Sequence, residues 1–234
     1  MKIGILCAGD EELAPFLPLI KDGKTTEKAK LHFYTGHMGD MDGIEVVTLF
    51  SGVCKVNAAI ATQLLIDEFG VDIILNAGTA GGMAEELEIF DTVISTELCY
   101  HDVAEDILTE FHPWMNSVFF AADSKLVQLS KSAVAKISPI GKVVWGRMVT
   151  GESFISEEGR QEICEKFAPL TVDMESASVA HVCYVNNIPF LSIRCITDTA
   201  NHSGIDNFDE NCAKASSIAK DITLALLAEI ERAW

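Results

Sequence analysis

Short, uninterrupted runs of apolar residues recur along the chain, and longer segments of mixed character separate them. The runs have sequences such as KIGILCA and VDIILNA, and they cover residues 2–8, 71–77, 91–98, 143–150 and 190–197. Runs of this length without polar alternation indicate strands that are buried on both faces, which occur mainly in parallel sheets covered by helices. The pattern therefore predicts an α/β protein with a largely parallel sheet.

The segments between these runs predict the connecting elements. Five of them are compatible with helices: residues 11–21, 56–69, 121–137, 175–187 and 213–232. Residues 31–38 and 44–50 flank the turn sequence GDMDG, and this arrangement predicts a hairpin. Strands that alternate with helices in this way predict helices on both faces of the sheet.

Length and composition favour a single compact unit. The chain has 234 residues, 49% of them hydrophobic, which is enough to bury a full core. No low-complexity tract, block of like charge, internal repeat or Ser/Gly/Pro-rich linker divides it. We therefore expect one domain over residues 1–234.

Charge and cysteine content narrow the possible partners and compartment. The formal net charge of −18 disfavours binding to nucleic-acid phosphates or to anionic lipid, and no apolar run reaches transmembrane length. The seven cysteines are widely spaced, contain no C-x-x-C pair and lie partly within apolar runs such as LSIRCIT. The N-terminal apolar run is too short for a signal peptide. These features predict a soluble, cytoplasmic protein with reduced cysteines and no zinc site.

Polar residues gather at the predicted carboxyl ends of the strands, where ligands bind in sheets of this kind. Carboxylates occur at three of these ends, as Glu12, Glu175 and Asp198, and the glycine-rich turn NAGTAGG occurs at a fourth. Each feature also has a purely structural reading. Glu12 and Glu175 suit the first turn of a helix, Asp198 suits a helix cap, and glycines permit tight turns anywhere. NAGTAGG matches neither common nucleotide-binding fingerprint.

Arg194 is harder to account for by structure alone, because it interrupts the buried run FLSIRCIT. A buried guanidinium requires a carboxylate or a polar ligand beside it. We expect Arg194, Glu175 and Asp198 to share one cleft, where they either satisfy one another or bind a hydroxylated ligand.

A series of motifs extends nearly from end to end of the chain: KIGILCAGDEEL, SGVCKVNAA, NAGTAGG, YHD, GESFI, VDMESASVAHVC and IRCITDTA. In this order they resemble the 5'-methylthioadenosine/S-adenosylhomocysteine nucleosidases, bacterial members of the nucleoside phosphorylase superfamily. The resemblance implies a three-layer α/β/α fold with a mixed, largely parallel central sheet. It also implies a homodimer without a cofactor or metal.

The implied reaction is hydrolysis of the N-ribosidic bond of 5'-methylthioadenosine and S-adenosylhomocysteine, which releases adenine and a 5'-thio-ribose. Asp198 matches the general acid, which protonates N7 because adenine leaves poorly as an anion, and Glu12 matches the residue that activates water. Paired carboxylates of this kind serve glycosidic cleavage in general. Glu175 matches the ligand of the ribose hydroxyls. The remaining matches are Met174 and Thr79 at the sugar, Phe154 and Ile155 at adenine, and Arg194 as the holder of the acidic network.

Two features of the sequence leave parts of this assignment open. Asp173 stands where the family usually has glutamate, and residues 103–120 lack the family's glycine-rich aromatic segment. The family's counterpart of that segment crosses the dimer interface to cover the 5' group. We expect Phe111, Trp114 and Met115 to line an apolar slot for that group. Because this segment departs from the family, the preferred 5' group is open, and a nucleosidase for another 6-aminopurine nucleoside remains an alternative.

Two further alternatives come from different classes of protein. A phosphate-dependent purine nucleoside phosphorylase would need cationic residues around its phosphate, but the corresponding segments read AGDEEL and NAGTAGG. A receiver-like signalling domain would hold Mg²⁺ in the acidic cluster after the first strand. That class needs an aspartate after the central strand and a shorter chain. Both are weaker than the nucleosidase assignment.

Overall fold

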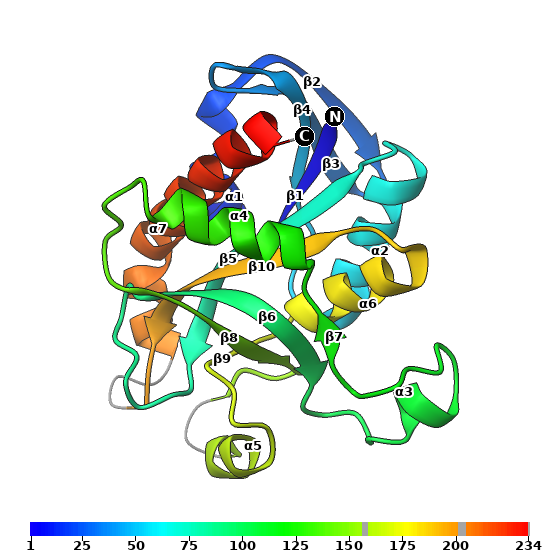
Figure 1. Ribbon diagram of the computed structural model, residues 1–234, viewed down its shortest axis with the longest axis vertical. Coiled ribbons are helices and arrows are strands. Elements are labelled where there is room, and N and C mark those ends of the chain that lie inside the picture. Colours follow the sequence, from blue (N-terminus) through cyan, green and yellow to red (C-terminus); the bar gives the residue numbers. More distant parts are fainter. Residues whose placement is uncertain (156–158, 201–204, 234) are drawn as a thin grey trace.

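A computed structural model describes residues 1–155, 159–200 and 205–233 (Figure 1). Its centre is one 10-stranded sheet with the strand order β10-β6-β8-β9-β5-β1-β4-β3-β2, and β7 pairs with β6. The strands are β1 (Lys2–Cys7), β2 (Ile20–Lys28), β3 (Leu31–Met38), β4 (Met41–Phe50), β5 (Ile73–Gly82), β6 (Thr92–Tyr100), β7 (Phe120–Ala121), β8 (Val143–Thr150), β9 (Thr171–Asp173) and β10 (Phe190–Asp198).

The sheet is mixed, and parallel pairs form its centre. β1 lies parallel to both β4 and β5, and β5 lies parallel to β10. The antiparallel pairs include β2 with β3, β3 with β4 and β6 with β10. The prediction of a mixed α/β sheet is confirmed, and so is the predicted hairpin, which forms β3 and β4.

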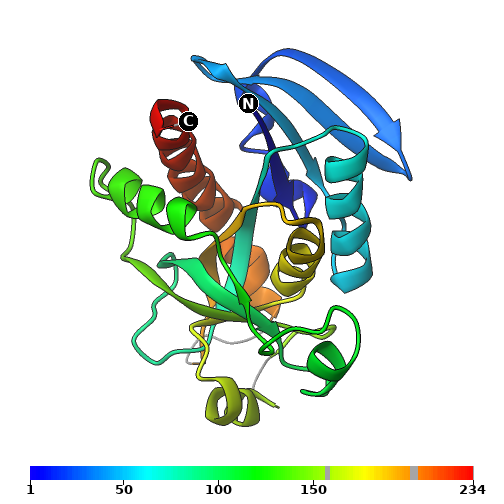
Figure 2. The same ribbon diagram turned by 45° about the vertical axis from the view of Figure 1, so that its right-hand side comes forward.

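Helices cover both faces of the sheet. They are α1 (Asp10–Leu13), α2 (Lys55–Asp67), α3 (Ile107–Glu110), α4 (Ser124–Val134), α5 (Arg160–Phe167), α6 (Ser176–Asn186) and α7 (Ile205–Ala233), with a short 3₁₀ helix at Leu17–Leu19. Figures 1 and 2 show α4 and α7 on one side of the central strands and α2 and α6 on the other.

Burial on both faces explains the continuous apolar runs. Within β1, Ile3 and Ile5 pack in the core under α4 and α7, whereas Leu6 packs in the core under α2 and α6. All three side chains are fully buried, and each contributes about 1.5–3 kcal/mol relative to an exposed position. A strand with apolar residues on alternate positions only would leave one of these cores incomplete.

The predicted helix at 11–21 is wrong. Only α1 and the short 3₁₀ helix form there, and β2 begins at Ile20 as an edge strand that the sequence did not predict. Pro15 and Pro18 explain the difference, because proline removes a backbone donor and its ring clashes with the preceding turn of a helix. Phe16 between them is buried in the core instead.

The segment NAGTAGG continues β5 and is not the turn that the sequence predicted. Its glycines allow side chains to approach the strand closely. A Cβ at Gly78 would lie 2.5 Å from the carboxylate of Glu12, and a Cβ at Gly81 would lie 3.1 Å from Oδ2 of Asp198. These two glycines therefore make room for the two carboxylates.

The sequence also did not predict α3 or β7, and two further differences lie in the second half of the chain. α5 was not predicted, and α7 begins at Ile205, eight residues before the predicted start at residue 213 (213 − 205 = 8). All seven cysteines are free thiols. In the ranges that the structure describes, every helix is too short or too polar to be a membrane span.

Candidate active site

The carboxyl ends of β1, β5 and β10 and the start of α6 surround a cavity of about 490 Å³. Except for Arg194, every residue that was matched to the family's site lines it: Glu12, Thr79, Phe154, Ile155, Met174, Glu175 and Asp198. Parallel strands explain this convergence, since their carboxyl ends meet at one edge of the sheet. The structure thus brings the predicted residues together around one cavity.

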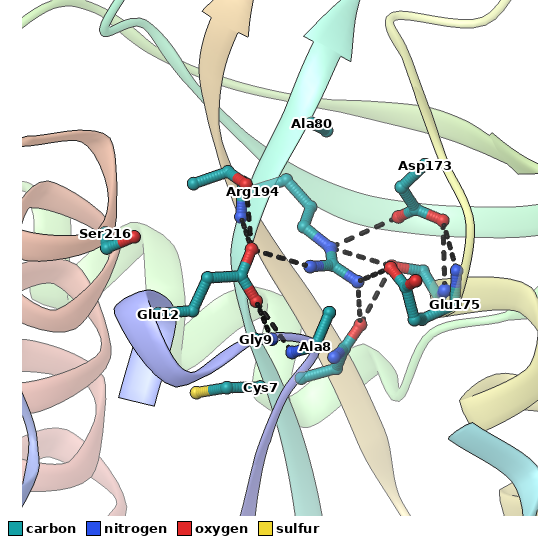
Figure 3. Close-up of polar contacts among 12 residues, drawn as sticks. Cys7, Ala8, Gly9, Glu12, Ala80, Asp173, Glu175, Arg194 and Ser216 are labelled. Atoms are coloured by element: carbon teal, nitrogen blue, oxygen red, sulfur yellow. Dashed lines mark hydrogen bonds and ion pairs between the residues drawn. The ribbon is translucent and has the colours of Figure 1, made fainter. Parts of the chain in front are cut away.

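Glu12 projects from α1, and backbone groups of the turn after β1 and of β5 fix its carboxylate (Figure 3). Its Oε2 accepts hydrogen bonds from the amides of Ala8 at 2.6 Å and Gly9 at 3.4 Å. Its Oε1 accepts from the amide of Thr79 at 2.7 Å and from the Thr79 hydroxyl at 2.8 Å. The carboxylate thus has one orientation at the cavity wall, which suits a group that must receive a proton at a defined point.

Arg194 lies fully buried beside the cavity and faces three carboxylates (Figure 3). Its Nε is 3.1 Å from Oδ2 of Asp173, its Nη1 is 3.8 Å from Oε1 of Glu12, and its Nη2 is 3.6 Å from Oε2 of Glu175. Among the described residues, Asp198 is not one of its ion-pair partners. Glu175 and Asp198 share one cavity, as expected, but Arg194 lies beside it and pairs with Glu175 and not with Asp198.

Asn76 is a second support of the guanidinium, and no pattern in the sequence pointed to it. Its Oδ1 accepts from Nη2 of Arg194 at 2.9 Å and from the hydroxyls of Ser176 at 2.8 Å and Ser192 at 3.2 Å. Its Nδ2 donates to the carbonyl of Leu6 at 3.0 Å. Because all of these polar groups are buried, their mutual hydrogen bonds are required for the site to form at all.

Asp173 anchors the start of α6. Its Oδ1 accepts from the hydroxyl of Thr150 at 2.6 Å and from the amides of Glu175 at 3.1 Å and Ser176 at 3.0 Å. A short acidic side chain before a helix satisfies amides that the helix itself leaves unpaired. The structure therefore joins Asp173 to the start of α6, to Thr150 of β8 and to Arg194.

Glu175 is the most strongly perturbed carboxyl group of the site. Burial raises its pKa to about 7, although the guanidinium of Arg194 acts in the opposite direction. Asp173 raises the pKa further, and a hydrogen bond from the amide of Cys54 to Oε1, 2.9 Å long, lowers it. Near neutral pH the group is therefore ready to change its charge when a ligand enters the cavity.

Asp198 ends β10 on another part of the cavity wall. Burial raises its pKa, while a hydrogen bond from the hydroxyl of Thr197, 2.9 Å long, and the charge of Arg160 act against this. A raised pKa keeps the proton on a carboxyl group closer to neutral pH. Asp198 thus differs from Glu12, whose oxygens accept four hydrogen bonds from backbone and hydroxyl groups.

The loop after β8 supplies the apolar wall. Phe154 and Ile155 line the cavity, and the ring of Phe154 contacts that of Phe208 edge to face at a centroid distance of 6.5 Å. Met174, between two acidic residues, also lines the cavity. A flat apolar wall beside polar groups suits a ligand that has both an aromatic and a hydroxylated part.

Comparison with known proteins agrees with this geometry. The phosphorylase superfamily pattern matches residues 2–228. The 5'-methylthioadenosine/S-adenosylhomocysteine nucleosidase of Oceanobacillus iheyensis is 37% identical over 235 residues, which cover 98% of this chain and 100% of that protein. The chain belongs to this nucleosidase family of the phosphorylase superfamily.

Solved structures of family members have the same fold. A nucleosidase of Colwellia psychrerythraea in complex with adenine superposes with a TM-score of 0.89 at 34% identity, covering 98% of this chain and 95% of that one. A Neisseria meningitidis nucleosidase in complex with methylthio-immucillin-A gives a TM-score of 0.87 at 29% identity, covering 97% and 98%. The predicted family and fold are confirmed.

The segment that departs from the family pattern, residues 103–120, lies away from the cavity. Phe111 and Trp114 are 58% and 65% exposed on or beside α3, which projects from the body of the molecule in Figure 1. Met115 is instead buried in the core under α2 and α6, so the expectation that it lines a 5' slot is wrong. In this chain none of the three contacts the cavity.

Besides Asn76, two contributors to the site were missed. Phe208 belongs to α7, and the helical pattern read from the sequence began only after it. Cys54 contributes its backbone amide, which no side-chain pattern reveals. The turn before α2 carried a signal nonetheless, since SGVCKVNAA was one of the motifs shared with the family.

Proposed function

We propose that this protein hydrolyses the N-ribosidic bond of 5'-methylthioadenosine and S-adenosylhomocysteine, releasing adenine and a 5'-thio-ribose. The observation that supports this most directly is the pair Asp198 and Glu12. One cavity contains a carboxyl group whose pKa burial raises and another whose carboxylate is held by four hydrogen bonds. These are the properties needed for proton donation to a base and for activation of water.

In the proposed reaction, Asp198 donates a proton to N7 of adenine as the bond between N9 and C1' breaks. The electron pair of that bond leaves with the base, and positive charge develops on the ribose, as in other glycosidic cleavages. Glu12 orients a water molecule and accepts one of its protons while the oxygen bonds to C1'. Each proton transfer is worth about 10²–10⁴ in rate.

Three elements of the cavity would bind the nucleoside. We assign the ribose hydroxyls to Glu175, which Arg194 and the Cys54 amide hold in place. Thr79 and Met174 would contact the sugar, while Phe154 and Ile155 would contact adenine. The pKa of Glu175 is about 7, and the ionised form accepts stronger hydrogen bonds from hydroxyl groups than the protonated form does. These hydrogen bonds would therefore strengthen as the pH rises through 7.

Water, not phosphate, is the expected nucleophile. Arg194 lies buried beside this part of the cavity, within 4 Å of Glu12, Asp173 and Glu175, so its charge is already paired. A phosphate dianion next to these carboxylates would be repelled, whereas a neutral water molecule is not. The acidic cluster therefore supports hydrolysis over phosphorolysis.

We expect release of adenine from 5'-methylthioadenosine and S-adenosylhomocysteine at the same rate with and without phosphate. Incubation with these two nucleosides, adenosine and inosine, followed by chromatography of the free bases, tests this. Adenosine reports on the 5' group, and inosine reports on the 6-amino group. A strict need for phosphate, with ribose 1-phosphate as product, would show that the protein is a phosphorylase.

We further propose a homodimer formed through the face that carries α2 and α6. The first turns of α2 expose Val56 and Ile60 to 69% and 45%, and α6 exposes Tyr184 to 45%. α2 and α6 lie next to each other in Figure 1 and pack together. An apolar patch of this kind on a protein with a net charge of −18 is typical of a protein–protein interface.

Light scattering at micromolar concentration should give the mass of a dimer. Val56→Glu should convert the protein to a monomer, because it puts a charge into the centre of the patch. Ile140→Glu, at an apolar residue that is 55% exposed outside α2 and α6, is the matched control and should remain dimeric. A monomeric mass for the unmodified protein would exclude the dimer.

We also place the protein in the cytoplasm, since its seven free cysteines are typical of a reducing compartment.

A further inference from the structure

The backbone of Cys54 has a conformation that only glycine normally adopts. Its φ is 83° and its ψ is 164°, in a region where the Cβ of any other residue is strained. Cys54 precedes α2, and its amide donates to Oε1 of Glu175 at 2.9 Å. The strain therefore occurs at the residue whose backbone contacts the carboxylate that we assign to the ribose.

A group of three charged residues adjoins this turn, and we call it the Lys55 cluster: Lys55, Asp102 and Glu152. Nζ of Lys55 lies 2.9 Å from both carboxylate oxygens of Asp102. The amide of Lys55 donates to Oε1 of Glu152 at 3.1 Å, and the amide of Glu152 donates to Oδ2 of Asp102 at 3.0 Å. The cluster thereby joins the start of α2 to the segment after β6 and to the loop after β8. None of its members lines the cavity.

We propose that the Lys55 cluster holds Cys54 in its strained conformation and thereby directs the Cys54 amide at Glu175. Consecutive amides of Cys54 and Lys55 donate to two different carboxylates, one inside the site and one in the cluster. On the other side of the turn, the amide of Ser51 donates to the carbonyl of Cys7 at 2.9 Å. With both ends fixed, the backbone between them cannot relax to a negative φ.

Relaxation of this turn would change the site without removing any side chain from it. The Cys54 amide would no longer face Glu175, which would lose a hydrogen bond to its charged form. Strained conformations persist only where the surrounding contacts fix them, and they concentrate at functional sites. Lys55 and Asp102 are thus positioning residues, and the inference rests on the proposed role of Glu175 in binding ribose.

A double-mutant cycle between Cys54→Gly and Asp102→Ala tests the proposal. Glycine adopts the observed conformation without strain, so Cys54→Gly alone should raise the Tm by about 2–4 °C. Asp102→Ala should lower kcat/KM for 5'-methylthioadenosine about tenfold when residue 54 is cysteine, because one hydrogen bond to a charged group is lost. When residue 54 is glycine, the same substitution should cost less than about threefold. Equal losses in both backgrounds would overturn the proposal.

Two controls separate backbone strain from loss of the thiol and from a general weakening of α2. Cys54→Ala removes the thiol but keeps the Cβ, so it should respond to Asp102→Ala as cysteine does; a response like that of glycine would overturn the strain argument. Glu68→Gln breaks an ion pair with Lys28 at the opposite end of α2 and should show no coupling to Cys54→Gly. Coupling as large as that of Asp102→Ala would show that the effect is not specific to the cluster.

The Tm values of the same variants test the strain independently of any activity. Asp102→Ala should lower the Tm less in the glycine background than in the cysteine background. Glu175→Gln tests the proposed function separately: if it leaves KM unchanged, Glu175 does not bind ribose and the cluster has no role in substrate binding. If KM is unchanged in Glu175→Gln but the Tm values still show coupling between residues 54 and 102, the cluster does hold Cys54 in its strained conformation. Only the consequence for substrate binding would then be refuted.

Discussion

Asp198→Asn should lower kcat for 5'-methylthioadenosine by about 10² or more. Asparagine has nearly the shape of aspartate and still accepts the hydrogen bond from Thr197, but it has no proton to give to N7 of adenine. Burial raises the pKa of Asp198, so this carboxyl group keeps its proton closer to neutral pH, as a proton donor must. Steady-state kinetics with detection of free adenine measures the effect.

The thermal stability of the variant is the necessary control. Asp198→Asn should have a Tm equal to or above that of the unmodified protein, since an amide at this buried position has a lower desolvation cost than a carboxylate. It should also still bind the nucleoside. A kcat within a few-fold of the unmodified value would show that Asp198 is structural and that another group protonates the base.

Glu12→Gln should lower kcat by about 10²–10⁴, because the amide cannot accept a proton from water. It should also lower the Tm. The four donors around Glu12 all point at carboxylate oxygens, so the NH₂ group of glutamine must face donors on one side. Hydrogen bonds to a charged group contribute about 1.5–3 kcal/mol each, and part of that is lost. Kinetics and thermal unfolding should therefore both change.

Glu162→Gln is the matched control for this prediction. Glu162 lies in the first turn of α5, as Glu12 does in α1, but its side chain is exposed and does not line the cavity, so neither kcat nor Tm should change appreciably. If Glu12→Gln loses stability but keeps its turnover, the residue only supports the fold at the strand ends and water is activated by another group.

The location of the candidate site could be predicted because it depends on the order of strands and helices. Continuous apolar runs indicated the strands, and polar residues at their ends pointed to Glu12, Glu175 and Asp198. Arg194 was recognisable because a charge inside a buried strand needs a partner. The parts that failed depend on three-dimensional contacts. NAGTAGG continues as a strand because it pairs with β10 and β9, and this long-range pairing cannot be read from the glycines themselves.

Backbone contributions to the site were equally inaccessible from the sequence. The amide of Cys54 and the amide of Thr79 hold the two carboxylates Glu175 and Glu12, and any residue type except proline supplies an amide. The role of Asn76 was also not visible in the sequence, because the three groups that donate hydrogen bonds to it lie in α6 and β10, which are distant in sequence. Sequence patterns identify such residues only when their side chains are unusual for their surroundings, as for Arg194.

The contacts of Gly78 and Gly81 mean that β5 determines how far apart the two catalytic carboxyl groups lie. Gly78 abuts Glu12 and Gly81 abuts Asp198, so the two acids are registered three residues apart (81 − 78 = 3) on one strand. Three residues of a strand span about 10 Å, and pairing with β10 along this stretch and with β9 at Gly81 holds that length fixed. The distance between proton donor and water-activating group is therefore set by the backbone of the sheet. Loops around the cavity can vary in length and sequence, and so accommodate new 5' groups, without disturbing it.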